Sequence, residues 1–265
     1  QDLKGVPIGL ISSAWGGSAA ELWTPEEVFK TFPHLMKSYQ TLTPTEYYPS
    51  EVGAAYNSMI HPINDYKIAG AIWYQGETNT GNSSTYQEVL TELISSWRKV
   101  RGYEFPFYIV QIAPWESHQF AGAEVRNAQR MVAKTVPNTG LVVISDTITS
   151  EDDIHPKDKK TVGLRLANLI GKNIYQTFTK NKATLIMDYE EGLYFKNKIS
   201  TQFEIAGADG QFYPAKAIIK NKNIVLESEK VKNPSLVRFN WDNKKVADVF
   251  NGANLPMSTF TTEEK

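Results

Sequence analysis

The stretch Lys67-Ile-Ala-Gly-Ala-Ile-Trp73 runs directly into Tyr74-Gln-Gly-Glu-Thr-Asn79, and this succession decides the fold class. A short apolar run that ends in a polar, glycine-containing loop is typical of a buried strand. The next segment, Ser84–Arg101, repeats apolar residues at helical spacing and is followed by Gly102, where a C-terminal cap is wanted. The pattern therefore predicts a strand, a functional loop and a long amphipathic helix.

The same alternation extends in both directions along the chain. Further strands are expected at 7–12, 107–111 and 141–145, and further helices at 123–136 and 157–173. Strands that alternate with helices favour a mainly parallel sheet. After about residue 180 the pattern changes to short strand-like runs separated by turn signals, which predicts a small antiparallel β unit. We predict an α/β domain over residues 1–178 and a C-terminal β segment over 179–265.

Composition narrows the class of protein. The 265 residues are 41% hydrophobic and 22% charged, and they include no cysteine, which excludes a disulfide scaffold and a thiolate metal site. The formal net charge of −1 argues against a nucleic-acid or anionic-membrane partner, and no apolar run has the roughly 18 residues that a transmembrane helix needs. Because the chain opens on Gln1, we expect a cleaved or trimmed product.

Ligands of open α/β sheets bind beyond the carboxyl ends of the strands, so the loops after the predicted strands are the candidate sites. The first loop, Ser13-Ala-Trp-Gly-Gly-Ser18, carries Gly16 and Gly17. Glycine lets the backbone approach a ligand and aim an N–H at developing negative charge. A plain strand-to-helix turn also explains the pair and is the favoured interpretation of this loop taken alone.

The second loop places Gln75, Glu77 and Asn79 at alternating positions behind an apolar strand. Three hydrogen-bonding side chains are costly to bury unless they are paired. An asparagine amide there can donate to an oxyanion, and Glu77 can accept from a substrate hydroxyl. The alternative is a polar turn whose side chains satisfy one another.

The loop before the predicted helix at 157 carries Asp152, Asp153 and His155. A carboxylate two or three residues from a histidine can hold the imidazole in the tautomer that a general base needs. The alternative is an acidic helix start that complements the helix dipole. His118, which follows Glu116 in another loop, is a candidate for the substrate cleft. No metal site is predicted from the histidine spacing, and no phosphate-binding or dinucleotide-binding turn is present, so no cofactor is expected.

Taken together, these segments resemble the sialate O-acetylesterase family. The resemblance rests on Val6–Gly17, Tyr56-Asn-Ser-Met-Ile-His-Pro62, Trp73–Asn79 and Asp153-Ile-His-Pro156, which stand in the family's order. It extends into the tail through Phe203–Gly210 and Val231–Trp241. It implies a three-layer, flavodoxin-like SGNH hydrolase fold with a mainly parallel sheet, and a serine esterase that acts on an acetylated sugar or glycan.

The resemblance also implies roles for individual residues. Gly17, with Gly16 beside it, matches the oxyanion-hole glycine, and Asn79 matches the oxyanion-hole asparagine. His155 matches the general base. Its orienting acid is either Asp153, from the family's Asp-Ile-His-Pro, or Asp152, three residues before the histidine as in the wider SGNH pattern. For the substrate side of the site, Gln75, Glu77, Trp15 and His118 are the candidates.

The chain departs from the family pattern at the nucleophile. It contains neither the Gly-Gln-Ser-Asn that carries the family's serine nor a Gly-Asp-Ser, so we expect no nucleophile within these residues. The expected nucleophile lies upstream, in the same protein or in a separate N-terminal fragment. The expected substrate is an acetyl ester of sialic acid. Acetylated xylan or another polysaccharide, and a non-catalytic carbohydrate-binding relic, are the alternatives. The family implies a secreted or periplasmic bacterial protein.

Overall fold

A parallel sheet of three strands forms the centre of the N-terminal part. The structure, a computed structural model, describes residues 7–150, 154–167, 174–187 and 191–263. The sheet has the order β1-β2-β3 and all of its neighbours are parallel. Its strands are β1 (Ala71–Tyr74), β2 (Phe107–Val110) and β3 (Thr139–Val142). The α/β prediction is therefore confirmed at this level.

Two long helices connect these strands. Helix α3 (Ser83–Arg101) joins β1 to β2 and α4 (Ala121–Thr135) joins β2 to β3. Gly102 ends α3 in the left-handed conformation with φ 72°, and its N–H donates to Arg98 and Lys99 carbonyls, as the C-cap prediction required. The shorter helical segments are η1 (Ala20–Trp23), α1 (Glu26–Thr31), α2 (Pro33–Tyr39), η2 (Tyr56–Ile60), η3 (His61–Ile63), η4 (Thr78–Asn82), η5 (Ser145–Thr147) and α5 (Lys159–Ala167).

An aromatic cluster fixes α3 against the sheet. Trp73 of β1 meets Trp23 and Trp97 edge-on with ring centroids 6.2 Å apart, and Trp97 meets Phe107 of β2 at 6.0 Å. The Trp97 indole also donates to the Trp23 carbonyl at 2.9 Å. Edge-on aromatic pairs add roughly 1 kcal/mol each beyond their buried area. The cluster thus holds β1, and the loop that follows it, in a rigid frame.

The C-terminal part consists of antiparallel strands. Two four-stranded sheets have the orders β4-β5-β10-β9 and β13-β11-β7-β8, and β12 pairs with β6. The strands are β4 (Ile174–Thr179), β5 (Lys182–Met187), β6 (Tyr194–Phe195), β7 (Phe203–Ala206), β8 (Tyr213–Pro214), β9 (Lys216–Lys220), β10 (Asn223–Glu227), β11 (Leu236–Phe239), β12 (Val249–Phe250) and β13 (Phe260–Thr261). The predicted division between 178 and 179 falls inside β4, which pairs with β5, so the antiparallel unit includes Ile174.

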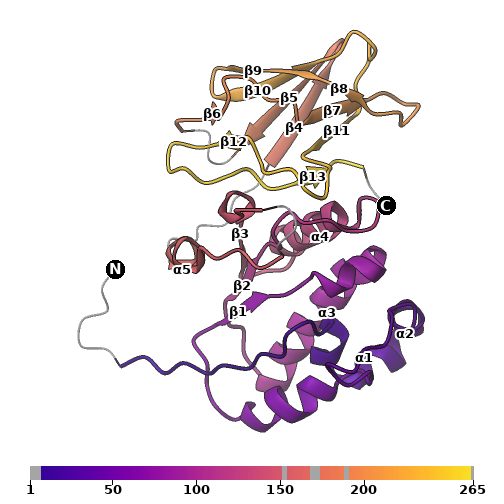
Figure 1. Ribbon diagram of the computed structural model, residues 1–265, viewed down its shortest axis with the longest axis vertical. Coiled ribbons are helices and arrows are strands. Elements are labelled where there is room, and N and C mark those ends of the chain that lie inside the picture. The colour runs from indigo at the N-terminus through magenta and orange to yellow at the C-terminus, as the bar shows by residue number, and fades with distance from the viewer. Residues whose placement is uncertain (1–6, 151–153, 168–173, 188–190, 264–265) are drawn as a thin grey trace.

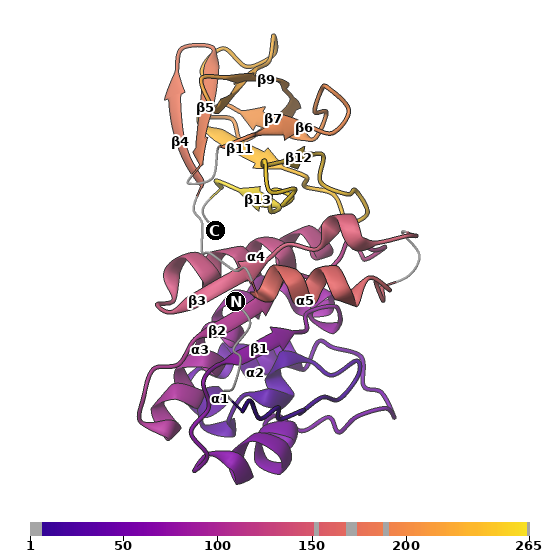
Figure 2. The ribbon, with the colours of Figure 1, turned by 90° about the vertical axis from the view of Figure 1, so that its left-hand side faces the viewer.

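Figures 1 and 2 show the antiparallel strands stacked on the α/β part, with α4 and β13 at the junction. Arg126 of α4 anchors that junction and is fully buried. Its Nε donates to Thr259 Oγ1 at 3.0 Å, and its two Nη atoms donate to the carbonyls of Asn243 and Asp242. Asn243 in turn donates to the carbonyls of Ser117 and Gln119. The last part of the chain therefore braces α4 and the loop before it.

Replacing Arg126 with methionine is expected to reduce the free energy of unfolding by about 2 kcal/mol. The variant keeps most of the apolar stem but leaves the acceptors on Asp242, Asn243 and Thr259 without a donor. Urea denaturation measures the change. Lys37→Met, at an exposed position of α2, is the matched control and is expected to stay within about 0.5 kcal/mol of the parent. An Arg126→Met variant as stable as the control would show that the junction does not depend on this guanidinium.

The strand predicted at residues 7–12 is wrong. These residues are irregular and pair with none of the described strands, and Ile8, Leu10 and Ile11 are 64%, 93% and 55% exposed. An apolar run forms a strand only where a neighbouring strand accepts and donates its hydrogen bonds. The predicted helix at 157–173 is observed over Lys159–Ala167; residues 157 and 158 are not helical, and 168–173 lie outside the described residues. Among the described residues, no helix is long and apolar enough to cross a membrane.

Candidate active site

The loop at Trp15–Ser18 is a tight turn closed by its own hydrogen bonds. The N–H and the hydroxyl of Ser18 both donate to the Trp15 carbonyl, at 3.3 and 2.7 Å. Gly17 has φ 74°, a left-handed conformation that glycine adopts without a Cβ penalty. Its N–H is exposed and has no acceptor among the described residues. The turn therefore presents a free backbone donor to the surface.

Trp15 stands beside this turn, and its indole N–H donates to the Tyr47 carbonyl at 2.8 Å. The side chain is 38% exposed, so one part of the ring remains open to solvent. Gly16 next to it meets no atom where a Cβ would lie. The predicted place of Trp15 on the substrate side of the site stays a prediction.

The loop after β1 lies directly against the Trp15–Ser18 turn. Thr78 Oγ1 donates to the Gly17 carbonyl at 2.6 Å, and Gln75 Nε2 donates to the Ser18 carbonyl at 3.1 Å. Two loops that are about sixty residues apart in sequence thus form one surface.

Gly76 allows this loop to leave β1. Its φ is 150°, and a Cβ there would lie 2.8 Å from Ile112 Cγ2 and 3.0 Å from both Gln129 Nε2 and Val125 Cγ1. Gln129 Nε2 also donates to the Gln75 carbonyl at 2.9 Å, so the crowding comes from groups that hold the loop.

Gly76→Ala is expected to cost about 2 kcal/mol of unfolding free energy, because the buried neighbours must move and the backbone is strained. Thermal denaturation followed by circular dichroism measures the loss. Gly163→Ala is the control, since a Cβ at this exposed position of α5 meets nothing within 4 Å and alanine favours helix. Equal stability of the two variants would contradict the assigned crowding.

Asn79 is fully buried, and a chain of hydrogen bonds fixes the orientation of its amide. The Oδ1 atom accepts from the Ala20 N–H at 2.9 Å and from Gln75 Nε2 at 2.7 Å. The Nδ2 atom donates to Glu21 Oε2 at 2.9 Å and to Asn82 Oδ1 at 3.0 Å. Both N–H bonds of Asn79 are therefore used internally. Its predicted donation to an oxyanion stays a prediction, and it would require one of these bonds to be exchanged.

Glu21 is a site residue that the sequence analysis missed. It is fully buried in the short helix η1, and its second oxygen accepts from Asn82 Nδ2 at 2.8 Å. Burial raises the pKa of Glu21, while the amide donors of Asn79 and Asn82 act in the opposite direction. The signal in the sequence was a single acid within the otherwise apolar Ala19-Ala-Glu-Leu-Trp23, four residues after Gly17.

Glu77 interacts with two basic side chains, His155 in the loop before α5 (the third loop) and Lys159, the first residue of α5. Burial raises the pKa of Glu77, and the backbone N–H groups of Glu77 and Gly76, together with the charges of His155 and Lys159, lower it. Lys159 Nζ lies 4.6 Å from the Tyr74 ring centroid and 3.4 Å from the Tyr74 hydroxyl. His155 is exposed. The third loop therefore approaches the carboxyl end of β1, and Gly17, Glu77 and His155 belong to one neighbourhood.

The two candidate orienting acids, Asp152 and Asp153, lie outside the described residues. A nearby acid that the sequence analysis did not single out, Asp146, forms a two-point ion pair with Arg165 of α5, at 2.6 and 2.7 Å. Arg165 Nη1 also donates to the Val143 carbonyl at 2.8 Å. This pair attaches α5 to the end of β3 and so fixes one side of the loop that carries His155.

His118 lies in a different setting from the other candidates. It is exposed in the loop between β2 and α4, and its neighbours Ser117 and Gln119 are bound by Asn243. No described contact joins it to Gly17 or Glu77. Its predicted place in the substrate cleft stays a prediction. Within the described ranges, no group of three or more acidic or histidine side chains could hold a metal ion.

Comparisons with known proteins identify the family of the chain. The family model described as "Carbohydrate esterase, sialic acid-specific acetylesterase" matches residues 1–172. The sialate O-acetylesterase of Homo sapiens is 31% identical over 183 residues, and that of Mus musculus is 29% identical over 205. Each alignment covers 60% of this chain, but only 34% and 38% of the respective relative. The chain thus spans little more than a third of these relatives.

A solved structure is similar over almost the whole chain. The crystal structure of a carbohydrate acetylesterase from Xanthomonas citri superposes with a TM-score of 0.83 at 32% identity. The match covers 98% of this chain and 62% of that one. Since the family model also covers more than half of the chain, this protein belongs to the carbohydrate esterase family of sialic acid-specific acetylesterases.

Proposed function

We propose that this chain supplies the general base and the oxyanion donor of a carbohydrate O-acetylesterase with an SGNH-type, flavodoxin-like catalytic domain. The observation that carries the proposal is the free N–H of the left-handed Gly17, beside a loop whose Glu77 interacts with His155. Acyl transfer requires an acceptor-free oxyanion donor and a general base in one site, and the Gln75–Asn79 loop links both groups, through Thr78 to Gly17 and through Glu77 to His155.

In the proposed mechanism, a serine outside these 265 residues attacks the acetyl carbonyl while His155 takes the hydroxyl proton. The Gly17 N–H stabilises the tetrahedral oxyanion, and this donor contributes roughly 3 kcal/mol to lowering the barrier. His155 then gives its proton to the departing sugar oxygen. Water, deprotonated by His155, attacks the acyl-serine in the same way and releases acetate. Asp152 or Asp153 holds the imidazole in the required tautomer.

The proposed substrate is an acetyl ester of sialic acid, because the curated relatives are sialate O-acetylesterases. An acetylated plant polysaccharide such as xylan is the second candidate, since the Xanthomonas citri relative is described only as a carbohydrate acetylesterase. An exported bacterial location, secreted or periplasmic, goes with either substrate.

Acetate release from 9-O-acetylated sialic acid and from acetylated xylan tests the proposal, with the natural full-length protein and the 265-residue chain side by side. We expect activity on sialic acid only in the full-length protein. A fluorophosphonate probe is expected to label a serine outside these residues, or in a separate N-terminal fragment that co-purifies with the chain. Labelling inside the chain would overturn the nucleophile assignment. Glycan binding without acetate release by every form would favour a non-catalytic relic.

A further inference from the structure

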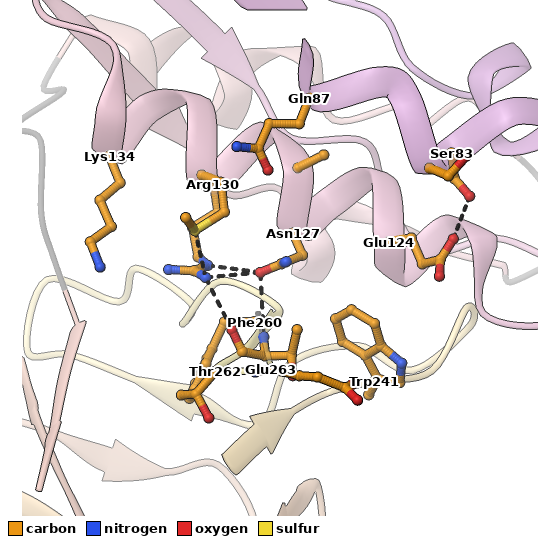
Figure 3. Close-up of a pocket in the computed structure, with 14 residues that line it drawn as sticks. Ser83, Gln87, Glu124, Asn127, Arg130, Lys134, Trp241, Phe260, Thr262 and Glu263 are labelled. Carbon is orange, nitrogen blue, oxygen red and sulfur yellow. Dashed lines mark hydrogen bonds between the residues drawn. The ribbon is translucent and has the colours of Figure 1, made fainter. Parts of the chain in front are cut away.

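A cavity lies between α4 and the C-terminal end of the described chain, away from the candidate active site. It has a volume of about 500 Å³ and is lined by residues of α3, α4, β13 and the segment around Trp241. Figure 3 shows these side chains gathered around one space. None of its lining residues belongs to the candidate active site. We call it the α4–β13 pocket.

Arg130 is the central charged group of the α4–β13 pocket. Its Nε and Nη2 donate to Asn127 Oδ1 at 3.2 and 2.9 Å, and Nη2 also lies 3.4 Å from the Thr261 carbonyl. Its guanidinium sits 5.6 Å from the Phe260 ring centroid. Nη1 donates to no acceptor in the part of the chain that the structure describes. One edge of the guanidinium fork is therefore open to the pocket.

Arg130 also lacks a neutralising carboxylate among the described residues, unlike Arg165 and Arg238, which form two-point pairs with Asp146 and Glu204. Burial lowers the pKa of Arg130 to about 10, so the side chain remains a cation at neutral pH. A partly desolvated cation without a counter-ion attracts an anion more strongly than one exposed to water.

The other charged groups that line the pocket are Lys134, Glu124 and Glu263. Lys134 follows Arg130 by one helical turn, and Figure 3 places both at the same end. Glu124, held by the Ser83 hydroxyl, lies at the other end near the indole of Trp241. The Asn127 amide, whose oxygen binds Arg130, keeps its Nδ2 as a donor between the two ends.

We propose that the α4–β13 pocket binds a carboxylated monosaccharide. The carboxylate binds Arg130 Nη1 and Lys134, the ring hydroxyls bind Asn127 and Glu124, and the ring face packs on Trp241. A cationic end selects a carboxylate, while an acidic end accepts hydroxyl protons and disfavours a ligand that is anionic throughout. Amphipathic indole rings suit the apolar faces of sugars, and the volume is within the range of small-molecule sites.

Isothermal titration with glucuronate and with its methyl ester, which lacks only the charge, tests the proposal. We expect glucuronate to bind, the ester to bind at least tenfold more weakly, and added salt to weaken glucuronate alone. Lys134→Met is expected to weaken glucuronate binding about tenfold without affecting folding, because the side chain is exposed. Arg130→Lys keeps the positive charge but loses the planar pair of guanidinium N–H donors, and it is expected to weaken glucuronate binding further. Lys99→Met, on α3 outside the pocket, is the matched control.

Three results would overturn the assignment: no binding of glucuronate by the parent protein, equal binding of the ester, or equal loss in Lys99→Met and Lys134→Met. Because the pocket and the candidate active site share no residue, Lys134→Met is expected to leave acetate release from a small ester unchanged. Failure of the esterase proposal would leave the binding result standing, and the reverse also holds.

Discussion

Replacing His155 with alanine is expected to lower the turnover of acetyl ester hydrolysis about 10³-fold in the natural full-length protein. The His155 imidazole interacts with Glu77 in the loop after β1, and imidazole has the ordinary pKa of a general base at neutral pH, whereas the nearby Lys159 is a much stronger base. Without it the nucleophile keeps its proton and the leaving oxygen receives none, and general acid–base catalysis accounts for roughly 10²–10⁴ in rate. Steady-state kinetics with a soluble acetyl ester measures the effect, which should fall on kcat and much less on KM.

His34→Ala is the matched control for this experiment. His34 is an exposed histidine of α2 whose Nε2 lies 2.8 Å from Glu88 Oε2 of α3, and no described hydrogen bond joins it to Gly17, Glu77 or His155. Its loss is expected to leave kcat within about twofold of the parent. A His155→Ala protein that retains a tenth or more of the parent turnover would exclude His155 as the general base.

Glu21→Ala is expected to destabilise the fold by about 4 kcal/mol. The Ala20 N–H can only donate, so it fixes the Asn79 oxygen, and Asn79 Nδ2 then fixes the Asn82 oxygen. Both carboxylate oxygens of Glu21 consequently face amide donors. Removing them leaves two buried donors unpaired and a cavity in a core position. Urea denaturation gives the change in unfolding free energy.

Glu21→Gln separates the hydrogen bonds from the volume. The glutamine oxygen still accepts from one of the two asparagine amides, but the glutamine amide N–H₂ then faces the N–H₂ of the other asparagine. One of the two hydrogen bonds is therefore lost, and we expect about half of the alanine effect. Glu27→Ala, an exposed acid of α1, is the control and is expected to be nearly neutral. If Glu21→Ala were as stable as Glu27→Ala, the network would contribute nothing to the position of the loop that carries Asn79.

The parts of the fold that the sequence predicted are those governed by local patterns. The strand before Gln75, the helix at 84–101 and its glycine cap each follow from spacing within a few residues, and the structure agrees with them. The Gly17 and Thr78 loops meet as expected, but the assigned reason fails, because residues 7–12 form no strand that could place the Gly17 loop at the edge of the sheet.

The parts that sequence could not supply depend on partners far along the chain. Glu21 reads as an ordinary surface acid until Asn79 and Asn82 are placed beside it. The segment at 7–12 has the composition of a strand, but composition does not reveal whether a neighbour is present to pair with it. The orientation of the Asn79 amide likewise depends on the backbone N–H of Ala20, far along the chain, together with Gln75 of its own loop.

The bracing of α4 by the tail has a consequence for how such a protein can change over generations. Gln111 at the end of β2 donates to Ser258 Oγ at 2.8 Å, and Arg126 reaches the carbonyls of Asp242 and Asn243. The antiparallel unit is therefore not structurally independent of the α/β part. A recombination event that exchanged it for another β module would need to import matching acceptors for α4 at the same time. The two parts are accordingly expected to be inherited as a pair and to diverge together.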